Sequence, residues 1–262
     1  MADGDYKAFI VEGEVREPQI IDNISKVFFA YGNFKIITLP AEENIYMLWK
    51  KLKADDFDTD IIEVLRESND DIREQLVGLS RDDFSEVYLF FDYDMHQTNL
   101  GKEDDADAVA QMLESFDNET ENGKLYISYP MVEALRDYKP GLCGEKQTCY
   151  VAVGQMTEYK NVSSVRSANP HFREYDYETW KDIIDVFAMR VSCLFGSVGT
   201  LDYERYSETA RPYDIYVQEK ERQNGEVFIL SAFPEFLVDY YGVKLWRTCV
   251  KHRKNQRDIK GC

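Results

Sequence analysis

"VYLFFDYDMH", residues 87–96, joins an apolar run rich in β-forming residues to two aspartates, Asp92 and Asp94. Continuous apolar runs of this kind are typical of strands buried on both faces of a parallel sheet. Side chains two positions apart on an extended strand point the same way, so Asp92 and Asp94 share one site. When two carboxylates lie this close together, either the pKa of one of them rises or a cation binds between them. The stretch therefore predicts a buried strand that ends at a cation site.

Three other apolar runs predict strands of the same sheet. They are Ala8 to Val11, residues 33–40 and residues 124–130. Helical periodicity separates the runs, beginning at Pro18, spanning 41–83 and 105–116, and starting again in MVEALRDY (131–138). Alternating strands and helices predict an α/β fold with a mostly parallel sheet flanked by helices.

The chain changes character near residue 140. Before it, residues 41–83 read as a helical insertion of two or three helices. Pro140 and Gly141 then interrupt the pattern, and the apolar patterns that follow are helical. We therefore expect a metal-binding domain over residues 1–140 and a mainly helical domain over 141–262, which ends in a basic tail at 244–260.

The net charge of −18 is confined to the first half of the chain. Residues 1–140 hold 14 Lys and Arg against 32 Asp and Glu, whereas residues 141–262 hold 17 of each. Such an acidic half repels a polyanion unless divalent cations change the local sign. Most of these acids are expected to be solvated surface residues.

The basic tail is the opposite feature. It holds seven cations against one acid, Asp258, with Trp246 among them. Such clusters are typical of phosphate contacts, and the aromatic ring could stack on an unpaired base. We expect Arg253, Lys254 and Arg257 to contact substrate. Two alternatives remain open, a solvated tail and a tail that folds back onto the acidic half.

Other sequence features exclude several classes of protein. No apolar run approaches the ~20 residues that cross a bilayer, and the acidic N-terminus does not read as a signal peptide. The sequence contains neither a P-loop nor a GxGxxG motif. The five cysteines are odd in number and lack the spacing of a zinc site, so we expect free thiols in the cytoplasm.

Carboxylates follow more than one predicted strand. Glu12-Gly13 ends the first strand, with Glu17 shortly after it, and the last strand ends at Ser128-Tyr129-Pro130, with Glu133 shortly after it. The carboxyl ends of parallel strands meet at one edge of a sheet, where ligands bind. Carboxylate sets without softer ligands suit Mg²⁺ or Mn²⁺. A single strand-end acid is more often a helix cap or a solvated residue, so the prediction rests on the combination.

The pairing of FIVEGE (9–14) with FFDYD (90–94) resembles the TOPRIM domain of topoisomerases, primases and OLD-type nucleases. EGEVREP (12–18) is similar to the start of RloB-like TOPRIM proteins, and ISYPMVEAL (127–135) to a later segment of theirs. The effector of the PARIS anti-phage system is a related protein. The resemblance covers roughly residues 7–137, while Arg16 stands where many RloB-like sequences have Thr.

The resemblance implies a role for each matching residue. It makes Glu12 a metal ligand or general base, and Asp92 and Asp94 ligands of Mg²⁺. Glu17 would help to hold a second ion, and Glu133 would complete the site. Ser128 and His96 are weaker candidates for substrate contact, and a solvated loop position is the ordinary explanation for His96.

The expected function is Mg²⁺-dependent hydrolysis of DNA or RNA, with tRNA one candidate substrate. An OLD- or RloB-like chain would act in anti-phage defence under the control of a separate ABC-type ATPase, and a homodimer is compatible with the sequence. A non-catalytic TOPRIM-like regulatory subunit is the main alternative. A primase or strand-passing enzyme ranks last, because the accessory modules of those enzymes are not recognisable here.

Overall fold

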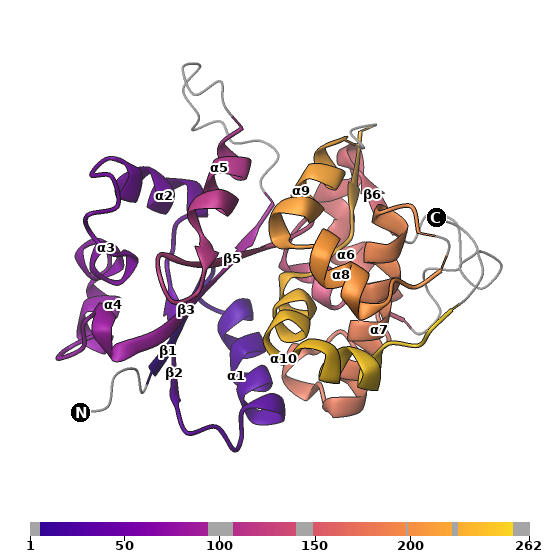
Figure 1. The fold of residues 1–262 in the computed structure, drawn as a ribbon, viewed down its shortest axis with the longest axis horizontal. Coiled ribbons are helices and arrows are strands. Elements are labelled where there is room, and N and C mark those ends of the chain that lie inside the picture. The colour runs from indigo at the N-terminus through magenta and orange to yellow at the C-terminus, as the bar shows by residue number, and fades with distance from the viewer. Residues whose placement is uncertain (1–5, 94–106, 140–148, 198, 222–224, 254–262) are drawn as a thin grey trace. The chain divides into compact units, whose positions relative to one another are not determined.

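The computed structural model describes residues 6–93, 107–139, 149–197, 199–221 and 225–253 of the chain (Figure 1). The chain divides into two compact units. The first contains the described residues up to Phe91 and those from 107 to Leu125. The second contains Asp92, Tyr93 and the described residues from Tyr126 onward. The second unit thus takes in residues that lie before the expected domain boundary at 140.

A five-stranded, mostly parallel sheet carries the α/β fold, as predicted. Its strands are β1 (Tyr6–Val11), β2 (Lys35–Pro40), β3 (Phe84–Asp92), β4 (Asp117–Asn118) and β5 (Gly123–Ser128). The order across the sheet is β2-β1-β3-β5-β4. Strand β1 pairs in parallel with both β2 and β3, whereas the short β4 pairs antiparallel with β5.

The central strands contain long apolar runs because the chain covers both of their faces. Residues Ala8 to Val11 of β1 are fully buried, and so are Val87 and Leu89 of β3. The rings of Phe9 and Phe90 stack across the two strands with centroids 5.9 Å apart. The apolar run at residues 87–91 is therefore part of a buried strand, as predicted.

Helices precede and follow these strands in the first unit. They are α1 (Arg16–Phe28), α2 (Ile45–Lys53), α3 (Ile61–Ser68), α4 (Asp70–Gln75), α5 (Ala108–Ser115) and the 3-10 helix η1 (Arg81–Asp83). Figure 1 shows α1 and the α2–α4 group on different sides of strands β1, β2 and β3. The side chains of Asn44, Asp60 and Asn69 accept backbone hydrogen bonds at the starts of α2, α3 and α4. The helical stretch expected over 41–83 is confirmed.

The second unit is mainly helical, as expected. Its helices are α6 (Tyr159–Arg166), α7 (Tyr177–Leu194), α8 (Tyr203–Thr209), α9 (Pro212–Glu221) and α10 (Ala232–Cys249), with 3-10 turns η2 (Val132–Leu135), η4 (Val153–Glu158) and η5 (Phe172–Glu174). It also contains an antiparallel strand pair that the sequence did not indicate, β6 (Tyr150–Ala152) with β7 (Glu226–Phe228). The helix expected from MVEALRDY is only the single turn η2, because the Tyr138 carbonyl accepts a hydrogen bond from the Ala168 amide.

Helix α10 is interrupted at Gly242. The residue has φ 61° and ψ −149°, a region that glycine alone occupies readily. A Cβ at this position would also lie 3.2 Å from the Tyr203 hydroxyl. The chain therefore forms two helical segments, and the second one places Trp246 against the ring of Tyr206, with centroids 4.6 Å apart.

The structure also bears on the expectations about membrane spans and cysteines. No described helix is long and apolar enough to cross a membrane. Cys149 and Cys249 are free thiols, as expected, whereas Cys193 is disulfide-bonded.

Candidate metal centre at the ends of the parallel strands

The strand register determines where the predicted carboxylates emerge. Val11, the last residue of β1, pairs with Phe90 of β3 in a parallel ladder. Glu12 directly follows Val11, and Asp92 lies two residues beyond Phe90 as the last residue of β3. Both side chains are half-buried. The two acids thus follow adjacent strands at their carboxyl ends, which is the arrangement that the sequence predicted.

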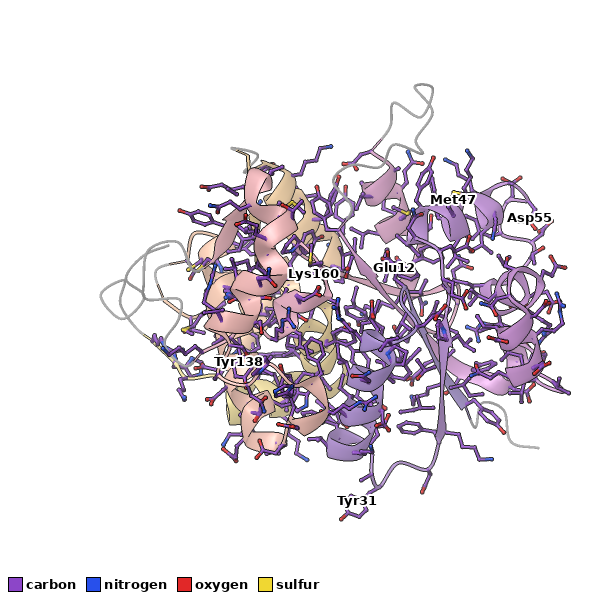
Figure 2. All side chains as sticks on the ribbon, turned by 180° about the vertical axis from the view of Figure 1, so that it is seen from behind. Glu12, Tyr31, Met47, Asp55, Tyr138 and Lys160 are labelled. Atoms are coloured by element: carbon purple, nitrogen blue, oxygen red, sulfur yellow. The ribbon has the colours of Figure 1, made fainter. Side chains whose placement is uncertain are left out.

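Glu17 lies against the loop that carries Glu12 (Glu12 is labelled in Figure 2). A Cβ added at Gly13 would meet Oε2 of Glu17 at 2.9 Å and Oε1 at 3.2 Å. The Glu17 side chain is buried in the first turn of α1, where the helix dipole favours a negative charge. The sequence Glu-Gly therefore has a steric reason, since the glycine makes room for the second carboxylate.

Four of the predicted site residues lie outside the described residues. They are Asp94, His96, Lys254 and Arg257. The part of the chain that the structure describes contains no group of three His, Cys, Asp or Glu side chains arranged to hold a metal ion. The carboxylate oxygens of Glu12, Glu17 and Asp92 are nevertheless the donor type that Mg²⁺ and Mn²⁺ prefer. The chemistry of the donors agrees with a hard cation, and the predicted set needs Asp94 to be complete.

Ser128 is part of the framework next to Asp92. The amide of Tyr93, the residue after Asp92, donates to the Ser128 carbonyl at 3.0 Å. The Ser128 hydroxyl is buried and accepts a hydrogen bond from the Ala232 amide at the start of α10, at 3.3 Å. These contacts join Ser128 to Tyr93 and to the start of α10, a structural role that its predicted substrate contact did not include.

Glu133 is fully buried in η2, and Lys160 of α6 lies beside it. The Lys160 ammonium is 4.0 Å from Oε1 of Glu133, and just over half of the lysine side chain is exposed. The sequence did not single out Lys160, because the two residues are distant along the chain and no motif links them. If Glu133 binds a metal ion, that ion must share the carboxylate with the nearby Lys160 ammonium.

The beginning of the basic tail is bound to the protein itself. Arg253 donates to both carboxylate oxygens of Asp185 on α7, at 3.0 and 2.7 Å. Asp185 also accepts from the Lys251 amide at 2.8 Å, and the Arg253 carbonyl accepts from the Thr200 amide. The structure therefore gives Arg253 an internal partner where the sequence predicted a phosphate contact.

Trp246 is likewise occupied within the fold. Only 1% of its surface is exposed, and its ring packs against Tyr206 and Tyr203. The expectation that this ring stacks on an unpaired base is wrong, because α10 turns the side chain inward after Gly242.

A buried charge network near η2 has no recognisable signal in the sequence. Asp137 is fully buried, and its carboxylate is surrounded by the guanidinium groups of Arg190 at 3.3 Å and Arg166 at 3.5 Å. The Tyr159 hydroxyl donates to the same carboxylate at 3.1 Å. Burial, and next the charge of Asp137, raise the pKa of Tyr159 well above its usual value. The network joins η2, α6 and α7 inside the second unit.

Aromatic side chains continue from the end of β3. The ring of Tyr93 lies 5.0 Å from that of Tyr129 and 6.2 Å from that of Tyr216, measured between centroids. Burial raises the pKa of Tyr129 well above its usual value, and the carboxylates of Glu235 and Glu219 add to this effect. The protein environment therefore keeps the Tyr129 hydroxyl protonated.

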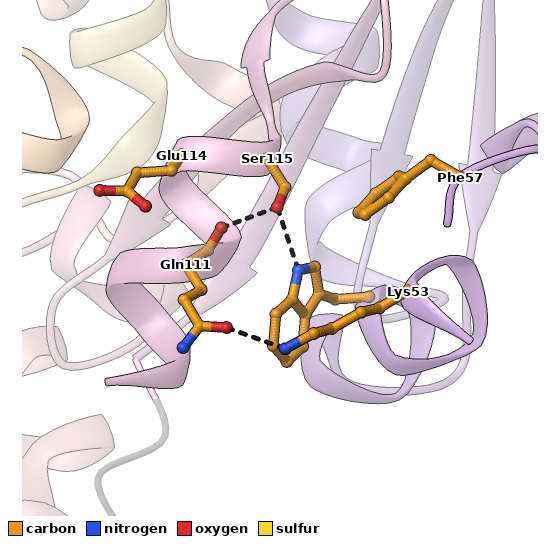
Figure 3. Close-up of a pocket in the computed structure, with 6 residues that line it drawn as sticks. Lys53, Phe57, Gln111, Glu114 and Ser115 are labelled. Carbon is orange, nitrogen blue, oxygen red and sulfur yellow. Dashed lines mark hydrogen bonds between the residues drawn. The ribbon is translucent and has the colours of Figure 1, made fainter. Parts of the chain in front are cut away.

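A groove between α2 and α5 is separate from the strand ends (Figure 3). Its volume is about 230 Å³, and its lining includes Trp49, Lys53, Phe57 and Gln111. The Trp49 indole donates to the Ser115 hydroxyl at 3.2 Å, and Lys53 donates to the Gln111 side chain at 2.9 Å. These bonds join α2 to α5, so we interpret the groove as a seam between helices.

Comparison with known proteins adds no relative to this description. No protein-family model, curated protein or solved structure matches the chain.

Proposed function

We propose that the chain is a metal-dependent nuclease of the TOPRIM type, which hydrolyses phosphodiester bonds of DNA or RNA. The observation that supports this most strongly is the parallel register of β1 and β3, because it sets Glu12 and Asp92 at the ends of adjacent strands. The approach of Glu17 to Gly13 adds a third carboxylate beside the Glu12 loop.

Each acid has a role in the proposed chemistry. Asp92 and Asp94 would hold the cation at the end of β3, and Glu17 would help to hold a second one. Bound Mg²⁺ would stabilise negative charge on the phosphate and activate the attacking water. The Glu12 carboxylate, as ligand or general base, would take up the proton of that water. Glu133 would complete this set, as the resemblance implies.

The charge distribution supports a requirement for metal. All of the net charge of −18 lies in residues 1–140, so without cations the substrate phosphates would be repelled. Divalent cations at the strand ends would reverse the sign where the reaction takes place. Cleavage should therefore depend steeply on Mg²⁺ or Mn²⁺, with monovalent salt unable to replace them.

Control by a partner belongs to the same proposal. An unrestrained cytoplasmic nuclease would damage its host, and the sequence contains no P-loop with which to regulate itself. We propose a phage-defence effector that an ABC-type ATPase holds inactive or activates. Overproduction of the chain alone without a growth defect, together with full nuclease activity of the purified chain, would contradict this part.

The test of the activity is a cleavage assay with supercoiled plasmid, total RNA and tRNA, in Mg²⁺, Mn²⁺ or EDTA. Glu12→Gln removes one charge at the site and should abolish cleavage. Glu14→Gln makes the same chemical change at an exposed position of the same loop and should leave it intact. Cleavage that survives in Glu12→Gln would point to a contaminating nuclease.

The non-catalytic alternative has one observation in its favour, the lack of a three-ligand group among the described residues. Titration with Mn²⁺, followed by electron paramagnetic resonance, separates the two functions without relying on activity. The nuclease requires Mn²⁺ binding that Glu12→Gln and Asp92→Asn weaken. A regulatory scaffold predicts no specific binding in either the native chain or the variants.

A further inference from the structure

Two segments that are distant in the sequence form one surface of the second unit. The first is residues 131–139, which contain η2, and the second is residues 159–169, which contain α6. The Arg136 side chain donates to the Ser163 hydroxyl at 3.1 Å and to the Lys160 carbonyl. The Ala168 amide donates to the Tyr138 carbonyl at 3.0 Å. These bonds hold the two segments side by side.

Within these two segments the acidic side chains are buried, and the basic side chains reach the surface. Their two acids, Glu133 and Asp137, are both fully buried. Their four cations are Arg136, Lys139, Lys160 and Arg166. Lys139 and Lys160 are exposed, and Arg136 and Arg166 are partly so. Solvent therefore meets the positive members of the cluster, while the negative members lie beneath them.

The buried Asp137 pairs with Arg166, whereas the buried Glu133 neutralises Lys160 only weakly. Asp137 forms ion pairs with Arg190, which is buried, and with Arg166, which is partly exposed. Lys160 approaches Glu133 no closer than 4.0 Å, and just over half of the lysine side chain is exposed, so solvent screens the pair. Lys160 (labelled in Figure 2) and Lys139 consequently keep their ammonium groups accessible to a ligand in solution.

We propose that this surface, formed by Arg136, Lys139, Lys160 and Arg166 and called the α6 patch, binds phosphates of the nucleic-acid backbone. The proposal rests on the proposed function and identifies the surface that captures its substrate. Charge complementarity is the argument, because four cations of the two segments reach the surface, with the exposed acid Glu158 just before α6, and such an excess of positive charge attracts a polyanion that the acidic half repels. Since Arg253 is bound to Asp185, the α6 patch takes the role that the sequence assigned to the basic tail.

The α6 patch adjoins a candidate site residue. Glu133, which the resemblance assigns to the metal centre, lies directly beneath Lys160. A phosphate held by Lys160 would therefore lie next to this carboxylate. Phosphate contacts position a nucleic acid without reading its sequence, so we expect the patch to bind DNA and RNA of any sequence.

The test compares two double variants that remove the same charge. Lys139→Ala with Lys160→Ala alters the patch, whereas Lys35→Ala with Lys50→Ala removes two exposed lysines outside both the patch and the basic tail. Fluorescence anisotropy with labelled single-stranded RNA and duplex DNA of mixed sequence, in Ca²⁺ at several KCl concentrations, gives the slope of log Kd against log salt. The patch variant should lower the slope by about 0.7 per lost contact on a single strand and about 0.9 on a duplex. The control should keep the native slope.

Two further measurements separate a folding defect and the wrong partner from the proposed role. Lys160→Arg preserves the charge and should restore the slope, and Lys139→Ala alone changes an exposed side chain that is not needed for the fold. Equal slopes for the patch and control variants would overturn the proposal. Sedimentation of the native chain and the patch variants at low salt shows whether the patch binds an acidic protein surface instead of nucleic acid. A patch-dependent change in mass without an effect on nucleic-acid binding would likewise reject the proposal.

The outcome is independent of the test of the nuclease. If Glu12→Gln abolishes cleavage while the α6 patch variants bind normally, the surface is wrong and the nuclease stands. If the native chain cleaves nothing but the patch variants lose the salt slope, the chain binds nucleic acid without cutting it.

Discussion

Gly13 and Glu17 are in such close contact that a Cβ at position 13 would approach the Glu17 carboxylate to 2.9 Å. The clash involves the end of a side chain, so Glu17 can move, but only by leaving its buried place at the start of α1. The glycine after Glu12 thus determines where the second carboxylate lies. This contact gives the first prediction.

Gly13→Ala should destabilise the protein by about 1 kcal/mol and weaken Mn²⁺ binding, because Glu17 is displaced. Glu17→Ala removes the group that the methyl would meet. The double variant should therefore lose less stability than the sum of the two single variants. Chemical denaturation of all four proteins measures this coupling. Strict additivity would show that the two residues do not constrain one another.

The clasp between Asp185 and Arg253 predicts a stability effect without a binding effect. Arg253→Ala leaves a buried carboxylate with only its backbone donor, and such a loss costs about 3 kcal/mol. Lys251→Ala removes two longer and more exposed pairs, to Asp182 at 3.7 Å and to Asp185 at 3.9 Å, and should cost less than about 0.5 kcal/mol. If Arg253→Ala instead reduced the salt slope of nucleic-acid binding at unchanged stability, the tail would be the substrate surface after all.

Buried tyrosines predict a loss of stability at alkaline pH. Burial raises the pKa of Tyr129, Tyr159 and Tyr206 well above the usual value. Below about pH 10 the folded and unfolded chains both keep these protons, so the stabilisation is complete. Above about pH 10 the unfolded chain releases them first, and each tyrosine reduces the stability by up to ~1.4 kcal/mol per pH unit until its folded pKa is reached.

Tyr129→Phe offers a selective check of this effect. Among the described residues the Tyr129 hydroxyl has no hydrogen-bond partner, so its removal should leave stability at pH 7 unchanged or slightly higher. The same variant should lose less stability on going to alkaline pH. Tyr31→Phe, at a fully exposed side chain, is the control and should change neither quantity. Equal alkaline losses in all three proteins would contradict the assignment.

Most of the sheet could be predicted because its strands are long apolar runs. Strands β1, β3 and β5 each bury consecutive residues, and that signal is local. Strands β4, β6 and β7 have only two or three residues each, too few for a pattern to be recognised. The helix expected after Pro130 ends after one turn, because the next residues bond to the region around Ala168. Such tertiary contacts leave no local trace.

The candidate site was predicted in the same uneven way. Glu12 and Asp92 carry a signal in their spacing from the strands, and the register of β1 and β3 agrees with it. Arg253 belongs to a conspicuous basic run, yet its partner Asp185 lies far away in an ordinary amphipathic helix. Lys160 had no distinguishing neighbour in sequence. The sequence showed where positive residues cluster, but it could not show which of them form ion pairs within the folded protein.

The backbone at Gly242 has a bearing on how a saturation-mutagenesis map of this chain should be interpreted. The position is only half-buried, and substitutions at such places are usually tolerated. Here every other amino acid meets an unfavourable φ/ψ combination and the nearby Tyr203 hydroxyl. A map would mark Gly242 as intolerant as strongly as the strand-end acids. That intolerance would reflect the backbone conformation that sets the direction of the second half of α10. It should not be taken as a sign of a reactive residue.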